Sequence, residues 1–110
     1  MRLGARVFQI EFVDQVRDPK TGEVDSTMSG VFEAGQGLIQ ITRDRDPGQM
    51  TEDLCHEILH AFFSMAGDPL PAPEEEALVL DLAPWLHAFL AQNPVLVAQI
   101  IRGAVEPQDE

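Results

Sequence analysis

The sequence predicts an α+β domain, a small antiparallel sheet of about three strands followed by helices. Alternating apolar and polar residues, separated by glycine and proline, fill the first half of the chain. A helical pattern follows from residue 51 to residue 66, and apolar runs bounded by proline make up the rest. The 110 residues give room for one domain with one modest core.

The first strand is predicted at residues 6–16, where Phe8, Ile10 and Phe12 alternate with other residues and share one face. A turn follows at residues 18–22, because aspartate, proline and glycine stand close together there.

Two further segments complete the predicted sheet. Residues 23–32 form a weaker, polar extended segment, and a glycine turn at 35–37 separates it from the short strand Leu38–Thr42. Ile39 and Ile41 alternate with polar neighbours, which predicts that this strand is half-exposed.

After a charged connector at residues 43–48, a helix is predicted over Thr51–Ala66. Thr51 is the expected N-cap, followed by two acidic residues that the helix dipole favours. Gly67 is expected to end the helix in a left-handed turn, and the following Asp-Pro prevents its continuation. The predicted apolar face consists of Leu54, Ile58, Ala61, Phe62 and Met65. The predicted polar stripe consists of Asp53, His56, Glu57, His60 and Ser64.

The remaining chain predicts two more helices. Pro73 suits the first position of a helix that Pro84 should kink or split. Asn93-Pro94 starts a last helix that runs to about Arg102, with Gly103 as its stop. Residues 104–110 are expected to be an acidic, disordered tail, which leaves one domain over residues 1–103.

Composition limits the location and the partners. The chain has 19 acidic and 7 basic side chains and a formal net charge of -12, which argues against a nucleic-acid surface. The single cysteine, Cys55, permits no intrachain disulfide and is expected to be a buried thiol. No apolar run has the length of a signal peptide or membrane span, so an intracellular location without membrane contact is expected.

The chemistry is concentrated in the pentad His56-Glu57-Ile58-Leu59-His60. Histidines four residues apart on a helix project side by side, so both imidazoles can reach one tetrahedral metal ion. Glu57 lies about 100° around the helix and can reach a water on that metal. Two of the chain's 3 histidines stand here, in a helix too apolar for an exposed position. The pentad therefore predicts a metal site.

A third protein ligand is needed for a hydrolytic zinc site. Glu75 and Glu76 are both expected to turn toward the apolar face of the second helix, and geometry alone does not separate them. Glu74 is expected to be exposed, and His87 to be a surface or core residue rather than a ligand. The candidates considered are Glu74, Glu75, Glu76, Asp81 and His87.

The pentad, followed by Glu75-Glu76-Ala77 on a second helix, resembles the gluzincin metallopeptidases. The most similar groups are small single-domain forms: minigluzincins, SprT-like and ImmA/IrrE-like proteins, and related phage or prophage proteins. The resemblance covers most of the chain and implies a minimal zincin-like fold. The expected location is the cytoplasm of a bacterial host. It selects Glu76 over Glu75 as the third ligand, beside His56 and His60.

The resemblance also implies one Zn²⁺ ion and hydrolysis of a peptide bond by metal-activated water, with Glu57 as general base. A peptide or protein substrate is expected to dock on an edge strand near Leu38–Thr42. The chain differs from larger gluzincins because it has no tyrosine to stabilise an oxyanion and no second lobe. A non-catalytic, zinc-containing regulatory or protein-binding module of phage origin is therefore the alternative.

Overall fold

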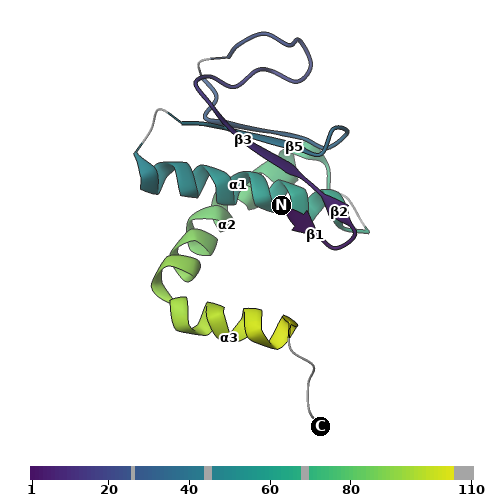
Figure 1. Ribbon diagram of the computed structural model, residues 1–110. Helices are drawn as coiled ribbons and strands as arrows, with labels where there is room; N and C mark the ends of the chain where they lie inside the picture. The colour runs from purple at the N-terminus through teal and green to yellow at the C-terminus, as the bar shows by residue number, and fades with distance from the viewer. Residues whose placement is uncertain (26, 44–45, 68–69, 106–110) are drawn as a thin grey trace.

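The computed structural model describes residues 1–25, 27–43, 46–67 and 70–105. Within them the chain forms a two-stranded sheet, a three-stranded sheet and three helices, in that order (Figure 1). The predicted α+β class is therefore confirmed. In this described part of the chain, none of the helices combines the length and apolar character that a membrane crossing requires.

The predicted first strand is divided in two. β1 (Arg2–Leu3) and β2 (Arg6–Val7) form a hairpin, and β3 (Gln9–Val13) belongs to the larger sheet. The division falls at Phe8, whose N–H donates to the carbonyl of Met1, whereas the N–H of the next residue donates to the carbonyl of Gly37. The chain changes its pairing partner at this point, and the Phe8 side chain is fully buried there.

The larger sheet has the strand order β3-β5-β4, with β4 at Gly30–Glu33 and β5 at Leu38–Thr42. β4 and β5 pair antiparallel, as predicted, but β3 and β5 pair parallel, so the expectation of a wholly antiparallel sheet is wrong for that pair. The connection from β3 carries the chain past the central position to the far edge. The hairpin that follows therefore places β5 between the other two strands and in the direction of β3.

β5 has the predicted alternation, because Ile39 and Ile41 are buried and their neighbours are partly exposed. It is nevertheless the central strand, so the expected edge at Leu38–Thr42 is not there. The turn before β5 requires glycine at position 37, where φ is 63° and a Cβ would lie 3.2 Å from the carbonyl oxygen of Val7.

The pentad lies in α1, which spans Pro47–Met65 and begins four residues earlier than predicted. The N-cap is Asp46, whose carboxylate accepts a hydrogen bond from the N–H of Gln49, and Pro47 takes the first helical position. Thr51 is not the cap, because its hydroxyl donates to carbonyls of the preceding turn.

The end of α1 also differs from the prediction. Ala66 leaves the helix in an extended conformation, and its N–H donates to the carbonyl of Phe63. The glycines with positive φ in the described chain are Gly4, Gly22 and Gly37, so Gly67 forms no left-handed turn. The expected Asp-Pro stop at positions 68 and 69 lies outside the described residues.

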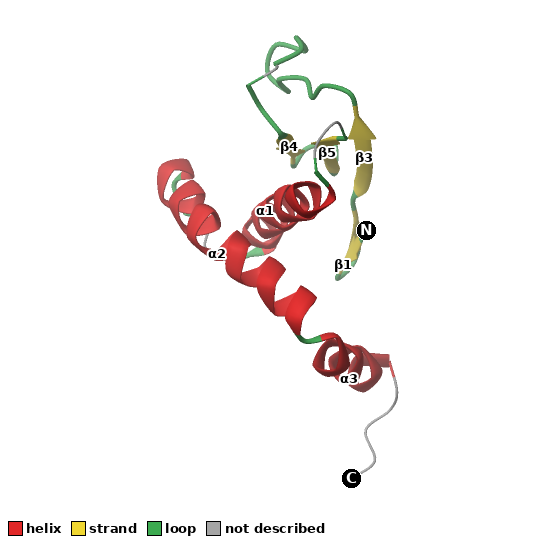
Figure 2. Cartoon of the chain, turned by 90° about the vertical axis from the view of Figure 1, so that its left-hand side faces the viewer, coloured by secondary structure: helices red, strands yellow, loops and turns green. Residues whose placement is uncertain are grey.

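α1 is covered on two sides, by the sheet through β4 and β5 and by α2 (Ala72–Gln92) (Figures 1 and 2). Leu59 packs with Val79 and Ala83 of α2, and Phe63 and Leu86 border this cluster. The predicted single apolar face is therefore inaccurate: Phe62 and Met65 are 45% and 44% exposed, and the buried residues of α1 are Cys55, Glu57, Leu59 and Ala61.

α2 runs without a break through Pro84, so this proline does not split the helix. α3 (Pro94–Val105) starts where predicted, since the carbonyl of Asn93 accepts from the N–H of Val97. It continues past Gly103, which is not its stop, so residues 104 and 105 are helical rather than tail. The rest of the predicted tail, residues 106–110, lies outside the described residues.

Candidate metal centre

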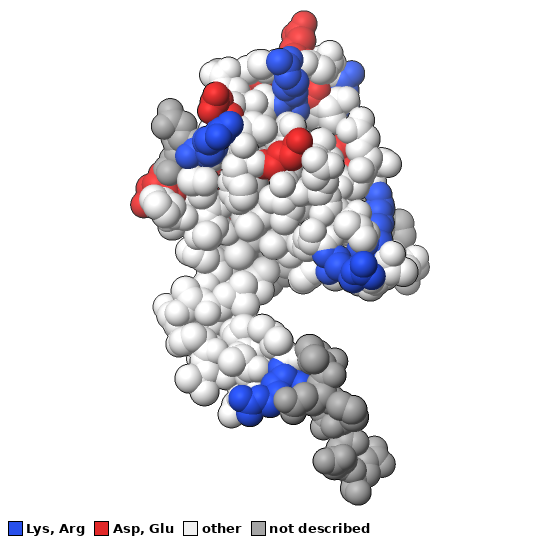
Figure 3. Space-filling model, in the orientation of Figure 1, with Lys and Arg blue, Asp and Glu red and all other residues white. Residues whose placement is uncertain are grey.

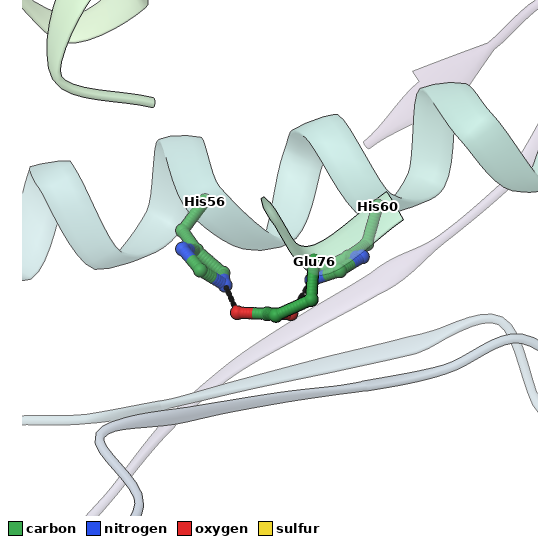
Figure 4. A group of neighbouring side chains, drawn as sticks. All are labelled: His56, His60 and Glu76. Carbon is green, nitrogen blue, oxygen red and sulfur yellow. Dashed lines mark hydrogen bonds and ion pairs between the residues drawn. The ribbon is translucent and has the colours of Figure 1, made fainter. Parts of the chain in front are cut away.

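Two helices bring the three predicted ligands together. His56 and His60 stand one turn apart on α1, and Glu76 stands in the second turn of α2 (Figure 4). One carboxylate oxygen of Glu76 lies 3.1 Å from Nε2 of His56, and the other lies 2.8 Å from Nε2 of His60. The ligand atoms of the three residues all lie within 4.8 Å of one another. The Glu76 carboxylate thus spans both imidazoles.

The register of α2 explains why these acids face α1. Val79 and Ala83 are buried against Leu59, and they fix the side of α2 that faces α1. Counting back by three or four residues along that side reaches Glu75 and Glu76. Both are partly buried, whereas Glu74 is exposed, as predicted.

Glu75 and Glu76 contact different atoms of the same imidazole. Oε2 of Glu75 lies 2.6 Å from Nδ1 of His60, on the opposite side of the ring from Glu76. In the tautomer whose Nδ1 donates to Glu75, Nε2 carries the lone pair that a metal ion beside Glu76 would accept. A carboxylate that holds the outer nitrogen of a histidine ligand is a common supporting contact in zinc sites. The two glutamates, between which sequence geometry did not choose, thus contact different nitrogens of one ring.

The donor set fits a zinc ion. Two imidazole nitrogens and one carboxylate leave one position open in a tetrahedron. With one ligand atom taken from each residue, the three atoms lie within 4.8 Å of one another, so the donors converge on one place. Burial lowers the pKa of His56, although Glu76 opposes this and His60 adds to it. This favours the neutral imidazole that a metal requires.

Glu57 is a buried carboxylate beside the triad, 6% exposed and the one buried charged side chain in the described chain. It points toward β4: a Cβ built on Gly30 would lie 3.3 Å from both Cγ and Oε1 of Glu57. Burial raises the pKa of Glu57 to about 7; His60 opposes the shift, and Glu76 and Asp53 add to it. A carboxyl with a pKa near neutrality is suited to exchange a proton with water.

Two cavities adjoin the triad, of about 370 and 490 Å³, and share the same central residues. The first extends over the N-terminal half of α1 toward Leu80 and Pro84 of α2. The second extends along β4 toward Lys20, the only lysine of the chain. The residues common to both are Met28, Gly30, His56, Glu57 and Glu76. A hollow surface therefore passes the triad along β4.

Other residues singled out in the sequence lie apart from the triad. Nε2 of His87 is 2.9 Å from the hydroxyl of Thr51, so His87 is engaged elsewhere on α1 and is not a member of the triad. Asp81 is exposed. Cys55 is buried, as predicted, and burial raises the pKa of its thiol, with Glu52 adding to the effect.

Sequence reasoning missed Gly30 and the contact that it permits. Nothing in the polar segment of residues 23–32 marks Gly30 as special, because its partner Glu57 is distant in the sequence. Comparison of the chain with protein-family models, curated proteins and solved structures finds no match. The gluzincin resemblance therefore rests on the residues of the pentad and of the second helix.

Proposed function

We propose that this protein is a zinc-dependent peptidase of the gluzincin type, with His56, His60 and Glu76 as the zinc ligands and Glu57 as the general base. One observation carries the proposal: a buried carboxylate lines the same hollow surface as three converging side chains that could hold a metal ion. A metal site with a purely structural role gains nothing from an ionisable group in that position.

When bound, zinc would polarise a carbonyl group and lower the pKa of a water in its open position. The chain's own residues supply the rest. Glu57 accepts the proton of the attacking water and returns it to the leaving amine, which its near-neutral pKa suits. Glu75 holds the ring of His60 in one orientation and tautomer.

The substrate would be an extended peptide beside β4. β4 is an edge strand of the three-stranded sheet, and Gly30, Val31 and Phe32 line the cavity next to the triad. An edge strand can pair with an added strand, which would place a peptide bond close to Glu57. This replaces the docking edge expected at Leu38–Thr42, because that strand is paired on both sides.

The alternative is a zinc-containing module without catalytic activity. It is favoured by one feature of composition: the chain has no tyrosine, so no phenol can stabilise an oxyanion. His87 does not replace it, since its ring contacts Thr51.

A peptide-library digest by the zinc-loaded protein and its Glu57→Gln variant separates these functions. The amide has the size of the carboxylate but cannot accept the proton, so the rate should fall by a factor on the order of 10²–10⁴ with zinc content unchanged. Cleavage that survived Glu57→Gln undiminished would exclude the proposed mechanism. No cleavage by the wild type across broad libraries would favour the non-catalytic module.

A further inference from the structure

Besides the metal centre, the molecule has a second unusual feature. It is the C-terminal arm, which we define as residues 82–101. It contains no Asp, Glu, Lys or Arg, although 24% of the whole chain is charged. Figure 3 shows it projecting away from the rest of the molecule, with α2 and the start of α3 almost free of charged atoms on the face in view. Its exposed large apolar side chains are Leu82, Trp85, Phe89, Leu90, Val95, Leu96, Ile100 and Ile101.

The arm has little support from the rest of the chain. In the described chain α3 packs against the end of α2, next to the junction of the two helices (Figure 2). The radius of gyration is 15.3 Å, above the roughly 13 Å expected of a compact chain of this length. A helix of 12 residues is marginal in water by itself, so α3 needs a packed apolar face to be stable.

The exposed area matches what a stable dimer requires. A large aromatic side chain presents on the order of 150–250 Å², and the aliphatic ones lie near the lower end of this range. The exposed fractions of the eight side chains together correspond to at most roughly 800 Å², so a partner that covered most of them would approach its share of a standard protein–protein interface. Trp85, 76% exposed, is the type of residue that anchors such interfaces.

The distribution of charge selects the partner. The formal charge of -12 resides outside the arm, so two copies can meet through their arms without placing like charges opposite one another. A basic or acidic partner would find no charge there to pair with. An anionic membrane surface would be repelled by the body and would find no lysine or arginine on the arm.

We propose that the arm is the interface of a homodimer, in which α2 and α3 of two copies pack against each other about a two-fold axis. In such an interface each arm covers the same apolar side chains of the other, and the surface is closed after two copies. The proposal is independent of the zinc site, because the eight exposed side chains lie outside both cavities beside the triad.

The test measures the mass of the full chain by sedimentation or light scattering over a range of concentrations. The variant is Val95→Asp, and the matched control is Val7→Asp on β2; the two valines are 72% and 61% exposed. Val95 is the second residue of α3, where the helix dipole favours a carboxylate, so the substitution should not unfold the helix. Circular dichroism checks this.

The expected wild-type mass is twice 12.2 kDa, and it should fall to that of one chain on dilution. Val95→Asp should weaken association at least roughly a hundredfold, because the dimer would bury two unpaired carboxylates. Val7→Asp should leave it unchanged. The single tryptophan gives a second readout without any variant: its emission should shift to longer wavelength on dilution, as Trp85 becomes exposed.

The proposal is overturned if the wild type has the mass of one chain at every concentration and its tryptophan emits as an exposed indole throughout. The arm would then be a binding surface for a different protein. Association that Val7→Asp weakened as much as Val95→Asp would also overturn it.

Discussion

The carboxylate of Glu75 lies 2.6 Å from Nδ1 of His60, while Nε2 of the same ring faces Glu76 at 2.8 Å. Two neighbouring glutamates on α2 thus hold one imidazole from both sides. At the proposed zinc site, Glu75 would therefore hold the ring of His60 rather than bind the metal.

Removing the Glu75 carboxylate should therefore weaken zinc binding without abolishing it. We expect Glu75→Ala to lower zinc affinity about 10–100-fold, with one ion still bound at saturation. Glu75→Gln should lose less, because its amide oxygen still accepts from Nδ1. Competition with a chelator measures the affinity, and Glu74→Ala, at the adjacent exposed position, is the control. If Glu75→Ala bound zinc as tightly as Glu74→Ala, Glu75 would not support the zinc site.

Gly30 gives a second prediction, which concerns the position of Glu57. A methyl group at residue 30 would lie 3.2 Å from Cδ1 of Ile41 and 3.3 Å from Cγ of Glu57. We expect Gly30→Ala to displace the Glu57 side chain, lower peptidase activity and destabilise the fold by about 1 kcal/mol, with zinc content retained.

The control for this substitution is Gly67→Ala, since a Cβ there would contact nothing within 4 Å. Thermal melting, zinc content and cleavage rate are compared for the two variants. Full activity in Gly30→Ala would show that the close approach of β4 to Glu57 is unimportant for catalysis.

The pH dependence of stability tests the buried state of Glu57 in metal-free protein. Its pKa in the folded chain is about 7, above the ordinary 4.5, because burial disfavours the charged form. The charge of His60 opposes the shift, while the charges of Glu76 and Asp53 add to it. The folded state therefore binds this proton more tightly than the unfolded chain. The resulting contribution to stability is complete below pH 4.5 and is lost as the pH rises through 7.

Glu57→Gln is neutral at every pH and does not lose this contribution. Above pH 7 the metal-free variant should be more stable than the metal-free wild type, by about 3 kcal/mol. The difference should be small at pH 4.5. Urea unfolding at a series of pH values, with chelator present, gives the comparison. If the stability difference between the two proteins did not change with pH, burial would not be raising the pKa of Glu57.

Zinc should also stabilise the fold, because its ligands come from two helices. Binding to the native state alone contributes about 4 kcal/mol when free zinc is a thousandfold above Kd. Complete chelation should therefore lower the melting temperature of the wild type and leave that of Glu76→Ala nearly unchanged. An identical melting temperature for wild type with and without chelator would contradict the bridging role of the metal.

The elements predicted correctly are those that depend on residues close together in the sequence. The pentad helix and the turn at residues 18–22 follow from apolar spacing and from proline and glycine. The start of α1 was misplaced although its signal is local: Asp46-Pro47 is a cap and first position, but the apolar pattern becomes clear only later. The exposed position of Phe62 was missed because α1 is covered from two directions, which one helix pattern does not reveal.

Contacts between residues far apart in the chain could not be predicted from the sequence. The parallel pairing of β3 with β5 depends on the path of the connection between β3 and β4, which has no local signature. His56 and His60 were found from their spacing alone. The different contacts of Glu75 and Glu76 with His60 depend on where α2 crosses α1. The approach of Gly30 to Glu57 depends on how the sheet packs over α1.

The central claim is tested most directly by the zinc content of protein purified without added metal, measured for the wild type, His60→Ala and His87→Ala. His87 is the matched control, because it is the chain's remaining histidine and contacts Thr51 rather than the triad. We predict one zinc per chain in the wild type and in His87→Ala, and a nearly complete loss in His60→Ala. Equal zinc in all three proteins, or none in the wild type, would contradict the assignment of the site.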